Sequence, residues 1–345
     1  MKHLDVKAES KISRIVIGES LKNLPKYLHN EKCIIITDSN VAEKYHNDFP
    51  EGMPVLEMGL GEGNKTLATV EKLIAQLLEL EADRGAYIIA IGGGIVTDVA
   101  GFVASIYLRG VKFGFVSTTL LAQVDASVGG KNGVNFEKLK NMVGVFNQPD
   151  WVICDIDALK TLDYEQFRSG FAEIIKAGAI KDKALFEYCE QNADAALKMD
   201  NEVLTHMVYE SVKMKANVVE ADEKEKGERR LLNFGHTFAH AIEKNTGLLH
   251  GMAVSIGMVI AAKLSEKLGF AENISERIIK VLKAYGLPVV PNTDIADLFE
   301  AMKQDKKREG DSIHMVLLSE IGNAFTHKVK YTELEKLIHD LRSDF

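Results

Sequence analysis

Three of the ten histidines in this 345-residue chain fall within fifteen residues, at His236, His240 and His250. His236 and His240 are four residues apart, so on a helix both rings project from one face, the geometry that a divalent metal needs. His250 follows a turn signal, Asn245-Thr246-Gly247, after which a second helix can return it as a further ligand. Isolated histidines are more often surface or core residues, but a cluster of histidines beside acids is typical of a metal or catalytic site. The cluster therefore predicts a metal enzyme.

Glu173 and Lys176 are three residues apart and share a face of a predicted helix. Small and apolar neighbours surround Glu173, which indicates a buried carboxylate whose desolvation a metal would offset. The alternative is an ion pair on a solvated helix, which is common and has little effect.

Several cations add to this pattern, although each taken singly is typical of a protein surface. The net charge of the chain is −8. An acidic protein that concentrates cations at one place is suited to an anionic substrate. The candidate cations are Lys131, Lys140, Lys176, Lys215, Arg229 and the pair Lys306-Lys307.

A glycine triplet, Gly92-Gly93-Gly94, follows an apolar strand and opens a helix. Such a loop lets backbone amides approach a phosphate, and a tight structural turn is the alternative. Asp38 also follows a strand, where it can accept ribose hydroxyls or cap the next helix. The loop that ends at Lys65 is not a P-loop, because Asn64 stands where that motif requires glycine.

Composition sets the class of protein. Hydrophobic content of 46% and charged content of 27% are those of a globular protein with two domains. The acidic balance argues against nucleic acid or an anionic membrane as partner. Three widely spaced cysteines and no apolar leader or membrane-length segment predict a cytosolic location.

The order of elements predicts an α/β domain with a wound, mostly parallel sheet over residues 1–160, then a helical domain over 161–345. Continuous apolar runs separated by helical patterns fill the first part, and long helices fill the second, with one β element near residues 313–329. The active site is expected in a cleft between the domains. The expected strands are 12–17, 33–37, 54–58, 87–91, 113–117 and 152–154.

The chain resembles the 3-dehydroquinate synthases of the sugar-phosphate cyclase family over nearly its whole length. Four ordered motifs carry the resemblance: Gly92-Gly93-Gly94 with Asp98, residues 117–131, residues 172–176, and residues 232–240. The resemblance implies an NAD-binding α/β domain, a helical metal-binding domain with Zn²⁺ or Co²⁺, and a homodimer.

The resemblance also implies roles for particular residues. The metal ligands are Glu173, His236 and His250, so that His240 contacts substrate instead of the metal. The NAD contacts are Asp38, Glu62, Lys65, Gly93, Gly94, Asp98, Thr118, Thr119, Thr161 and Leu162. The catalytic residues are Lys131, Lys176, Lys215, Arg229, Asn233 and His240. The substrate contacts are Arg109, reaching from the partner subunit, with Asp125, Lys131, Lys140, Asn141 and Lys306 or Lys307.

The implied reaction converts 3-deoxy-D-arabino-heptulosonate 7-phosphate to 3-dehydroquinate and phosphate. It proceeds by transient oxidation with NAD, phosphate elimination, re-reduction and an intramolecular aldol closure. Three departures from the family pattern, Thr97, Asn132 and Met252, lie beside residues with implied roles. Met252 stands where many members have glutamate, which bears on the support of His250.

Three other functions compete with this one. Other sugar-phosphate cyclases share the NAD and metal sites. Metal-dependent glycerol or alcohol dehydrogenases share the glycine triplet, but an uncharged alcohol gives no reason for so many cations. A catalytically silent binding protein would keep costly buried polar ligands to no purpose.

Overall fold

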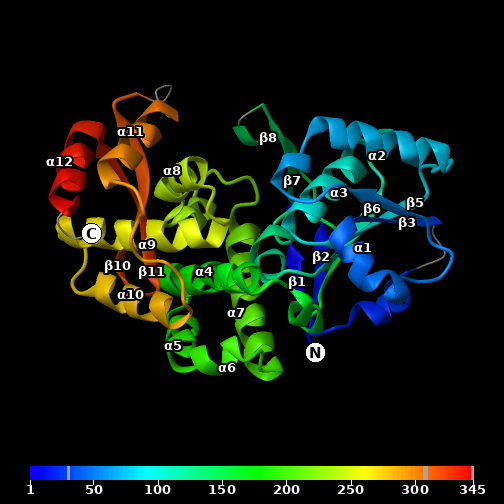
Figure 1. Cartoon of the computed structure of the whole chain (residues 1–345), viewed down its shortest axis with the longest axis horizontal. Coiled ribbons are helices and arrows are strands. Elements are labelled where there is room, and N and C mark those ends of the chain that lie inside the picture. Colours follow the sequence, from blue (N-terminus) through cyan, green and yellow to red (C-terminus); the bar gives the residue numbers. More distant parts are fainter. Residues whose placement is uncertain (29–31, 138, 306–309, 343–345) are drawn as a thin grey trace. The chain divides into compact units, whose positions relative to one another are not determined.

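The computed structural model describes residues 1–28, 32–137, 139–305 and 310–342. Its strands are β1 Lys2–Lys7, β2 Ile12–Ile17, β3 Lys32–Asp38, β4 Val55–Met58, β5 Ala86–Gly92, β6 Lys112–Ser117, β7 Lys131–Phe136, β8 Leu139–Phe146, β9 Trp151–Cys154, β10 Ser312–Glu320 and β11 Asn323–Lys330. Its α-helices are α1 Ser39–Tyr45, α2 Leu67–Glu79, α3 Gly94–Ile106, α4 Tyr164–Lys181, α5 Lys183–Gln191, α6 Ala193–Leu197, α7 Asn201–Ala221, α8 His236–Thr246, α9 His250–Lys267, α10 Ile274–Ala284, α11 Ile295–Asp305 and α12 Tyr331–Leu341 (Figure 1).

The chain forms two compact units. The first comprises Met1–Asp163 with Leu204–Lys224, and the second comprises Tyr164–Val203 with Glu225–Phe345. The first unit therefore includes most of α7, a segment that a division after residue 160 assigns to the second domain. Within the described residues, no helix combines the length and the apolarity needed to cross a bilayer.

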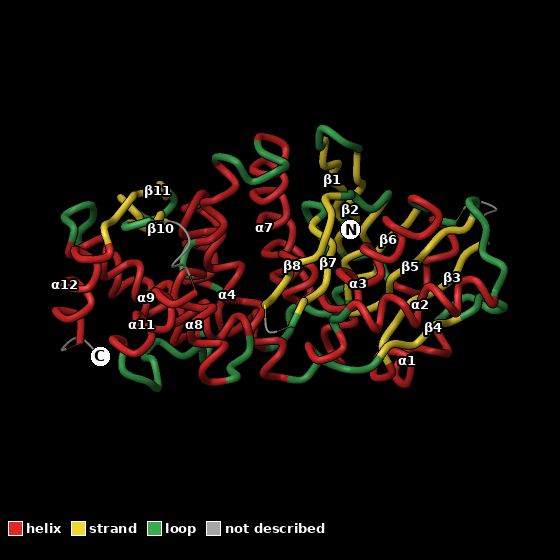
Figure 2. The backbone as a smooth tube through the Cα atoms, turned by 90° about the horizontal axis from the view of Figure 1, so that it is seen from above, coloured by secondary structure: helices red, strands yellow, loops and turns green. Residues whose placement is uncertain are grey.

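A seven-stranded sheet with the order β1-β2-β9-β6-β5-β3-β4 organises the first unit (Figure 2). Only β1 runs antiparallel to its neighbour, and the other pairs are parallel. The central strands β3 and β5 are apolar over nearly their whole length and almost fully buried, as expected for parallel strands covered on both faces. This agrees with the predicted wound, mostly parallel sheet.

The sheet has a topological switch point between β3 and β5. From β3 the chain continues to β4 on one side, whereas from β5 it continues to β6 on the other. Ligands of open α/β sheets bind beyond the carboxyl ends of strands at such a point. Asp38 ends β3 and the glycine triplet ends β5, so the residues expected to contact NAD flank it.

The second unit is mainly helical. The apolar run Ala253–Leu264 predicts a buried central helix, and it lies in α9, where Gly251 to Ala262 are all buried. The β element expected near residues 313–329 is present as the antiparallel hairpin β10–β11. This hairpin makes the unit helical with a small sheet, not purely helical.

Three elements differ from the sequence-based expectation. The β7–β8 hairpin is not among the expected strands, because the stretch that leads into it is rich in small and polar residues and β8 exposes most of its side chains. The helical spacing of the sequence predicts one helix over 183–197 and another over 231–245. The first is broken at Asn192, and the second, α8, begins only at His236 because Gly235 adopts a left-handed conformation with φ +80°.

Glu223 fastens the end of α7 within the first unit. Its carboxylate accepts hydrogen bonds from the backbone N–H and hydroxyl of Ser10, at 3.1 and 2.5 Å, and from the side chain of Gln148 at 3.1 Å. Burial alone would raise the pKa of Glu223, but these hydrogen bonds outweigh it and hold the pKa below its ordinary value of 4.5.

We predict that Glu223→Gln destabilises the protein by about 1–3 kcal/mol at neutral pH, because the amide N–H₂ would replace one of the two acceptor oxygens and face at least one of the three donors. The folded-state pKa is depressed, so the contribution of Glu223 is present above about pH 4.5 and disappears as the pH falls through the folded-state pKa. Denaturant unfolding of variant and wild type between pH 3 and 8 measures the difference. Glu220→Gln, at an exposed carboxylate that accepts one backbone bond from Lys7, is the control. A pH-independent difference would contradict this account.

Candidate functional site

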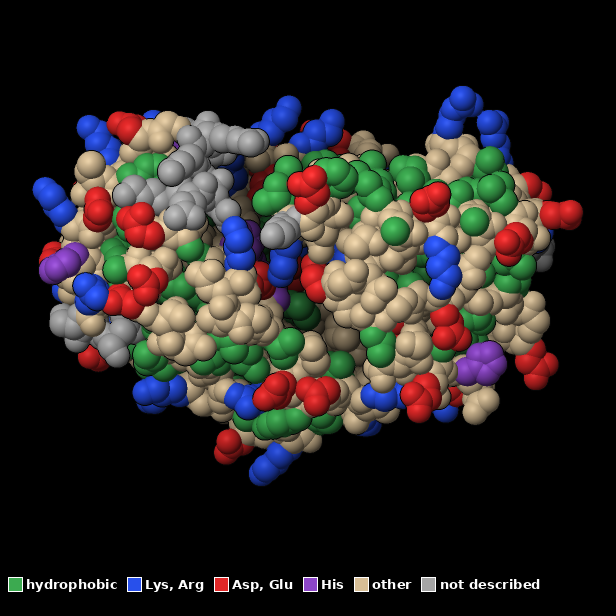
Figure 3. Space-filling view, turned by 45° about the horizontal axis from the view of Figure 1, so that its top comes forward, with side chains coloured by type: hydrophobic (Ala, Val, Ile, Leu, Met, Phe, Trp, Pro, Cys, Tyr) green, Lys and Arg blue, Asp and Glu red, His purple; other side chains and the backbone are tan. Residues whose placement is uncertain are grey.

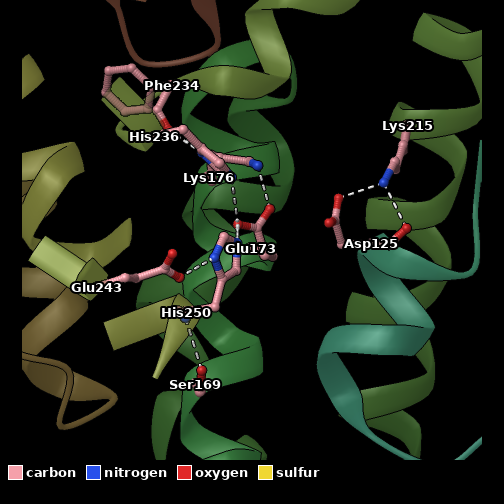
Figure 4. Close-up of polar contacts among 10 residues, drawn as sticks. Asp125, Ser169, Glu173, Lys176, Lys215, Phe234, His236, Glu243 and His250 are labelled. Atoms are coloured by element: carbon pink, nitrogen blue, oxygen red, sulfur yellow. Dashed lines mark hydrogen bonds and ion pairs between the residues drawn. The ribbon is translucent and has the colours of Figure 1, made fainter. Parts of the chain in front are cut away.

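Glu173, His236 and His250 place their ligand atoms within 4.8 Å of one another in the second unit. Glu173 lies in the middle of α4, and the two histidines are the first residues of α8 and α9. The Nε2 atoms of His236 and His250 lie 3.8 and 3.6 Å from Oε1 of Glu173. Figure 4 shows the three side chains pointing toward one another.

This donor set fits a catalytic zinc site. Two imidazoles and one glutamate are a known three-ligand arrangement that leaves a fourth position for substrate or water. Tetrahedral zinc with bonds of about 2.05 Å separates its ligand atoms by roughly 3.4 Å, so small side-chain movements would complete the site. Cobalt accepts the same donors.

Close backbone packing brings the three helices together. A Cβ atom on Gly251 would overlap the backbone of Ser169 on α4, and one on Gly257 would overlap the carbonyl of Gly235. Hydrogen at both positions therefore lets α9 touch α4 and the turn before α8. Ser169 also accepts a 3.0 Å hydrogen bond at Oγ from the N–H of Gly251, which holds the start of α9.

The surroundings of the two histidines shift their pKa values in opposite directions. Burial and the Lys176 ammonium lower the pKa of His236 to about 3, which keeps that ring in the neutral form that binds metals. Burial also opposes charge on His250, but Glu173 and Glu243 outweigh it and raise the pKa of His250 to about 9.

Other residues with expected roles lie on α4, on α8 and in the 3-10 helix that precedes α8. Lys176 is 3% exposed and forms an ion pair with Glu173, and Arg229 is 1% exposed in the 3-10 helix Glu228–Asn233. Asn233 donates a 2.7 Å hydrogen bond to Glu225. His240 is exposed, and its ring centroid lies 5.8 Å from that of His236. The helical spacing of His236 and His240 thus places them side by side, but the ligand group contains His250 and Glu173 instead.

In the first unit, the glycine triplet permits close packing at the start of α3. Added Cβ atoms would come within 2.7 Å of Val96 at Gly92, 2.9 Å of Thr119 at Gly93 and 2.9 Å of Ala126 at Gly94. The N–H of Thr118 donates to the carbonyl of Gly92 at 3.0 Å, so Thr118 and Thr119 adjoin the triplet. Both the structural turn and the helix N-terminus suited to anions are therefore present in one loop.

Lys65 contacts α3 near its start, shortly after the glycine triplet. Lys65 is 5% exposed. Its ammonium lies 2.5 Å from the carboxylate of Asp98 in α3 and 2.6 Å from the side-chain oxygen of Asn141. Burial raises the pKa of Asp98, and the Lys65 ammonium opposes that rise. Three residues expected to bind NAD or substrate are thus brought together.

The remaining expected NAD contacts make local interactions. Asp38 accepts a 2.9 Å hydrogen bond from the N–H of Val41 and so caps α1. Capping was one of its two expected roles, the other being to accept ribose hydroxyls. Glu62 accepts from Asn135 at 2.8 Å. Thr161 lies 2.5 Å from the hydroxyl of Tyr45, and Leu162 ends the 3-10 helix that contains Thr161.

The expected substrate residues of the first unit fall into two sets. Asp125 lies in a single π-helical turn, Ala122–Ala126, and receives the Lys215 ammonium at both its carbonyl (2.6 Å) and its carboxylate (2.5 Å). Lys131 and Lys140 are exposed on β7 and β8, and Arg109 is exposed after α3 with φ +69°. Lys306 and Lys307 lie outside the described residues.

The sequence reasoning assigned no role to Glu243, Glu225 or Asn135. Glu243 lies seven residues after His236, two helical turns along α8, and that spacing was a usable signal. Asn135 contacts Glu62, which is distant in sequence, and Glu225 contacts Asn233 from an irregular segment eight residues earlier, so no helical or strand spacing predicts either contact.

Comparison with known proteins agrees with this geometry. Two family models match, "3-dehydroquinate synthase N-terminal" over residues 55–169 and "3-dehydroquinate synthase C-terminal" over residues 170–308. The chain is 45% identical to the 3-dehydroquinate synthase of Halorhodospira halophila over 90% of this chain and 91% of that protein. It is 41% identical to that of Saccharolobus solfataricus over 90% of each chain.

Several solved structures are similar in fold to this chain. A 2-deoxy-scyllo-inosose synthase complexed with carbaglucose-6-phosphate, NAD⁺ and Co²⁺ matches with a TM-score of 0.88 at 26% identity, covering 98% of this chain and 100% of that one. A 2-epi-5-epi-valiolone synthase from Streptomyces hygroscopicus with NAD⁺ and Zn²⁺ matches with a TM-score of 0.86 at 28% identity, covering 96% and 97%. A probable glycerol dehydrogenase from Sinorhizobium meliloti, with a TM-score of 0.67 at 14% identity and 96% of each chain covered, shares the fold.

We predict that Gly257→Ala weakens zinc binding at least tenfold and lowers stability by about 1–3 kcal/mol, because the new methyl forces α9 away from the Gly235 turn. Zinc competition with a chromogenic chelator and thermal unfolding measure the two effects. Gly63→Ala, where an added Cβ meets nothing within 4 Å, should change neither. Wild-type zinc affinity in Gly257→Ala would show that this contact does not position the ligands.

Proposed function

The chain belongs to the 3-dehydroquinate synthase family, and from this premise we propose that it is a carbon–oxygen lyase of aromatic amino acid biosynthesis. The proposed reaction converts 3-deoxy-D-arabino-heptulosonate 7-phosphate to 3-dehydroquinate and phosphate. Identities of 41–45% over 83–91% of the length of curated synthases support this assignment.

The observation that carries the proposal is a buried cation beside the candidate metal site. Lys176 is 3% exposed and pairs with the ligand Glu173. Glu173 offsets part of the cost of burying this ammonium, but as a proposed metal ligand it shares its charge with the metal. An anionic sugar phosphate adds the opposite charge that Lys176 then needs and an uncharged alcohol adds none, which favours a cyclase over the dehydrogenases that share the fold.

We assign two cofactors to the chain. Glu173, His236 and His250 hold Zn²⁺, with Co²⁺ as a substitute. NAD is held at the carboxyl ends of β3 and β5 by Asp38, the glycine triplet and the pair Lys65–Asp98. When bound, NAD supplies a reversible hydride acceptor and the metal polarises substrate oxygens. The NAD⁺ and metal bound in the two cyclase structures support this assignment.

The chain's own residues then act mainly by position and charge. Lys131, Lys140 and Asn141 of the first unit bind the anionic groups of the substrate, and Lys306 is assigned the same role. Lys176, Arg229 and Asn233 of the second unit orient the hydroxyl and carboxylate oxygens, and His240 contacts substrate from the exposed face of α8. Fixed cations and dipoles need no reorganisation when charge develops on the leaving phosphate.

We also propose that two copies associate around Arg109. Leu108 and Arg109 both have positive φ, 49° and 69°, a strained conformation for residues other than glycine. This turn exposes Leu108 beside Ile106, at 38% and 39%, and exposed hydrophobic side chains also lie beside the β7–β8 turn (Figure 3). Exposed apolar side chains beside Arg109 suit a second copy that receives this arginine at its substrate phosphate.

A cytosolic location is part of the proposal. Cys33, Cys154 and Cys189 are each buried thiols, the form that reducing compartments maintain.

The decisive assay supplies purified protein with NAD, zinc and the heptulosonate phosphate. We expect phosphate and 3-dehydroquinate in equal amounts, no accumulation of NADH, and loss of turnover on chelation. His250→Ala should lose zinc and turnover while the first unit remains folded, whereas His339→Ala, at a histidine 79% exposed on α12, should retain both. NADH accumulation with simple alcohols would make the chain a dehydrogenase, and no phosphate release would indicate another sugar phosphate.

For the dimer, we predict that Leu108→Asp converts the protein to monomers in sedimentation equilibrium. Aspartate tolerates positive φ better than leucine, so the variant relieves strain and should still fold. Leu78→Asp, at another exposed leucine (60%), should leave the association unchanged. A wild-type monomer, or a dimeric Leu108→Asp, would refute this interface.

A further inference from the structure

The carboxylate of Glu243 is directed at the ring of His250. Oε1 of Glu243 lies 2.7 Å from Nδ1 of His250, and the Glu243 side chain is 5% exposed. The opposite ring nitrogen of His250, Nε2, faces Glu173 at 3.6 Å (Figure 4). The ring therefore stands between a candidate metal ligand and a second, separate carboxylate.

This contact determines which nitrogen of His250 can bind a metal. A carboxylate accepts hydrogen bonds, so Nδ1 keeps its proton and Nε2 is the nitrogen left to bind a metal. His236 is held in the same sense, with Nδ1 3.2 Å from the carbonyl oxygen of Phe234. His236 therefore contacts an uncharged backbone carbonyl two residues before it, whereas His250 contacts the carboxylate of Glu243 on α8.

We propose that Glu243 is the positioning residue of the metal site: it fixes the orientation and tautomer of His250 and strengthens Nε2 as a ligand. The proposal rests on the metal site assigned under the proposed function. Carboxylate partners of this kind raise ligand basicity, and their loss typically weakens metal binding 10–100-fold.

The arrangement also explains why α8 and α9 must meet at this end. His236 and Glu243 lie two turns apart on α8, so a single helix supplies one ligand and the support for another. Ser169 holds the backbone of α9 at Gly251, while Glu243 holds the His250 side chain. Met252, buried and apolar, offers no comparable group.

Glu243→Gln and Glu243→Ala test the proposal by zinc affinity. The amide retains an acceptor oxygen but loses the charge, so we expect about tenfold weaker binding for Glu243→Gln and about 100-fold for Glu243→Ala. The visible spectrum of the Co²⁺-loaded protein should change in both variants, because the position of one ligand changes. Thermal unfolding of the metal-free proteins should remain close to wild type for Glu243→Gln, which separates positioning from folding.

Two controls make the result specific. Glu266→Gln alters another carboxylate of the same unit, roughly 24 Å along α9 from His250, which accepts bonds from Ser275 at 2.8 and 2.7 Å. It should leave zinc affinity and the cobalt spectrum unchanged. Glu173→Gln should remove zinc binding altogether and thereby tests the metal site itself.

The outcomes separate the two claims. Wild-type zinc affinity and an unchanged cobalt spectrum in both Glu243 variants, with zinc binding lost in Glu173→Gln, would overturn the role of Glu243 while leaving the metal site intact. Equal losses of zinc affinity in Glu243→Gln and Glu266→Gln would overturn it as well, because the effect would then be a general one. A wild-type protein that binds no zinc would overturn the metal site and this inference together.

Discussion

The buried charge of Glu173 is the constraint on which the second unit depends. An ionised carboxylate at 3% exposure is unfavourable unless opposite charge and hydrogen bonds surround it. Lys176 supplies one charge from the same helix, and the proposed metal supplies the larger one through His236 and His250. Removing either histidine while keeping Glu173 would leave that carboxylate poorly compensated, which is why the site should be lost as a whole and not by degrees.

Geometry of this kind requires helices that approach more closely than ordinary side chains allow. Gly251 and Gly257 bring α9 into backbone contact with α4 and with the Gly235 turn. Because both histidines are the first residues of their helices, small shifts of either helix move a ligand directly. The first unit follows the same logic, since each glycine of the triplet meets a neighbouring side chain at the start of α3.

Much of this arrangement was predictable from the sequence, and the exceptions have physical reasons. Buried parallel strands were found because apolar runs such as Ile88–Ile91 stand out, whereas β1 and β8 alternate or expose their residues and give weak signals. Helical spacing alone paired His236 with His240. The family resemblance, and then the structure, placed His250 beside His236, because the left-handed Gly235 and Gly247 at the ends of α8 redirect the chain. Contacts such as Glu225 with Asn233, or Glu223 with Ser10, depend on packing that no local pattern encodes.

The most direct test of the central claim is anomalous diffraction at the zinc absorption edge from crystals of the zinc-loaded protein. The account predicts one principal peak within about 2.0–2.2 Å of a Glu173 carboxylate oxygen and of Nε2 of both His236 and His250. A peak coordinated by His240, or one that lacks Glu173 as a ligand, would contradict it.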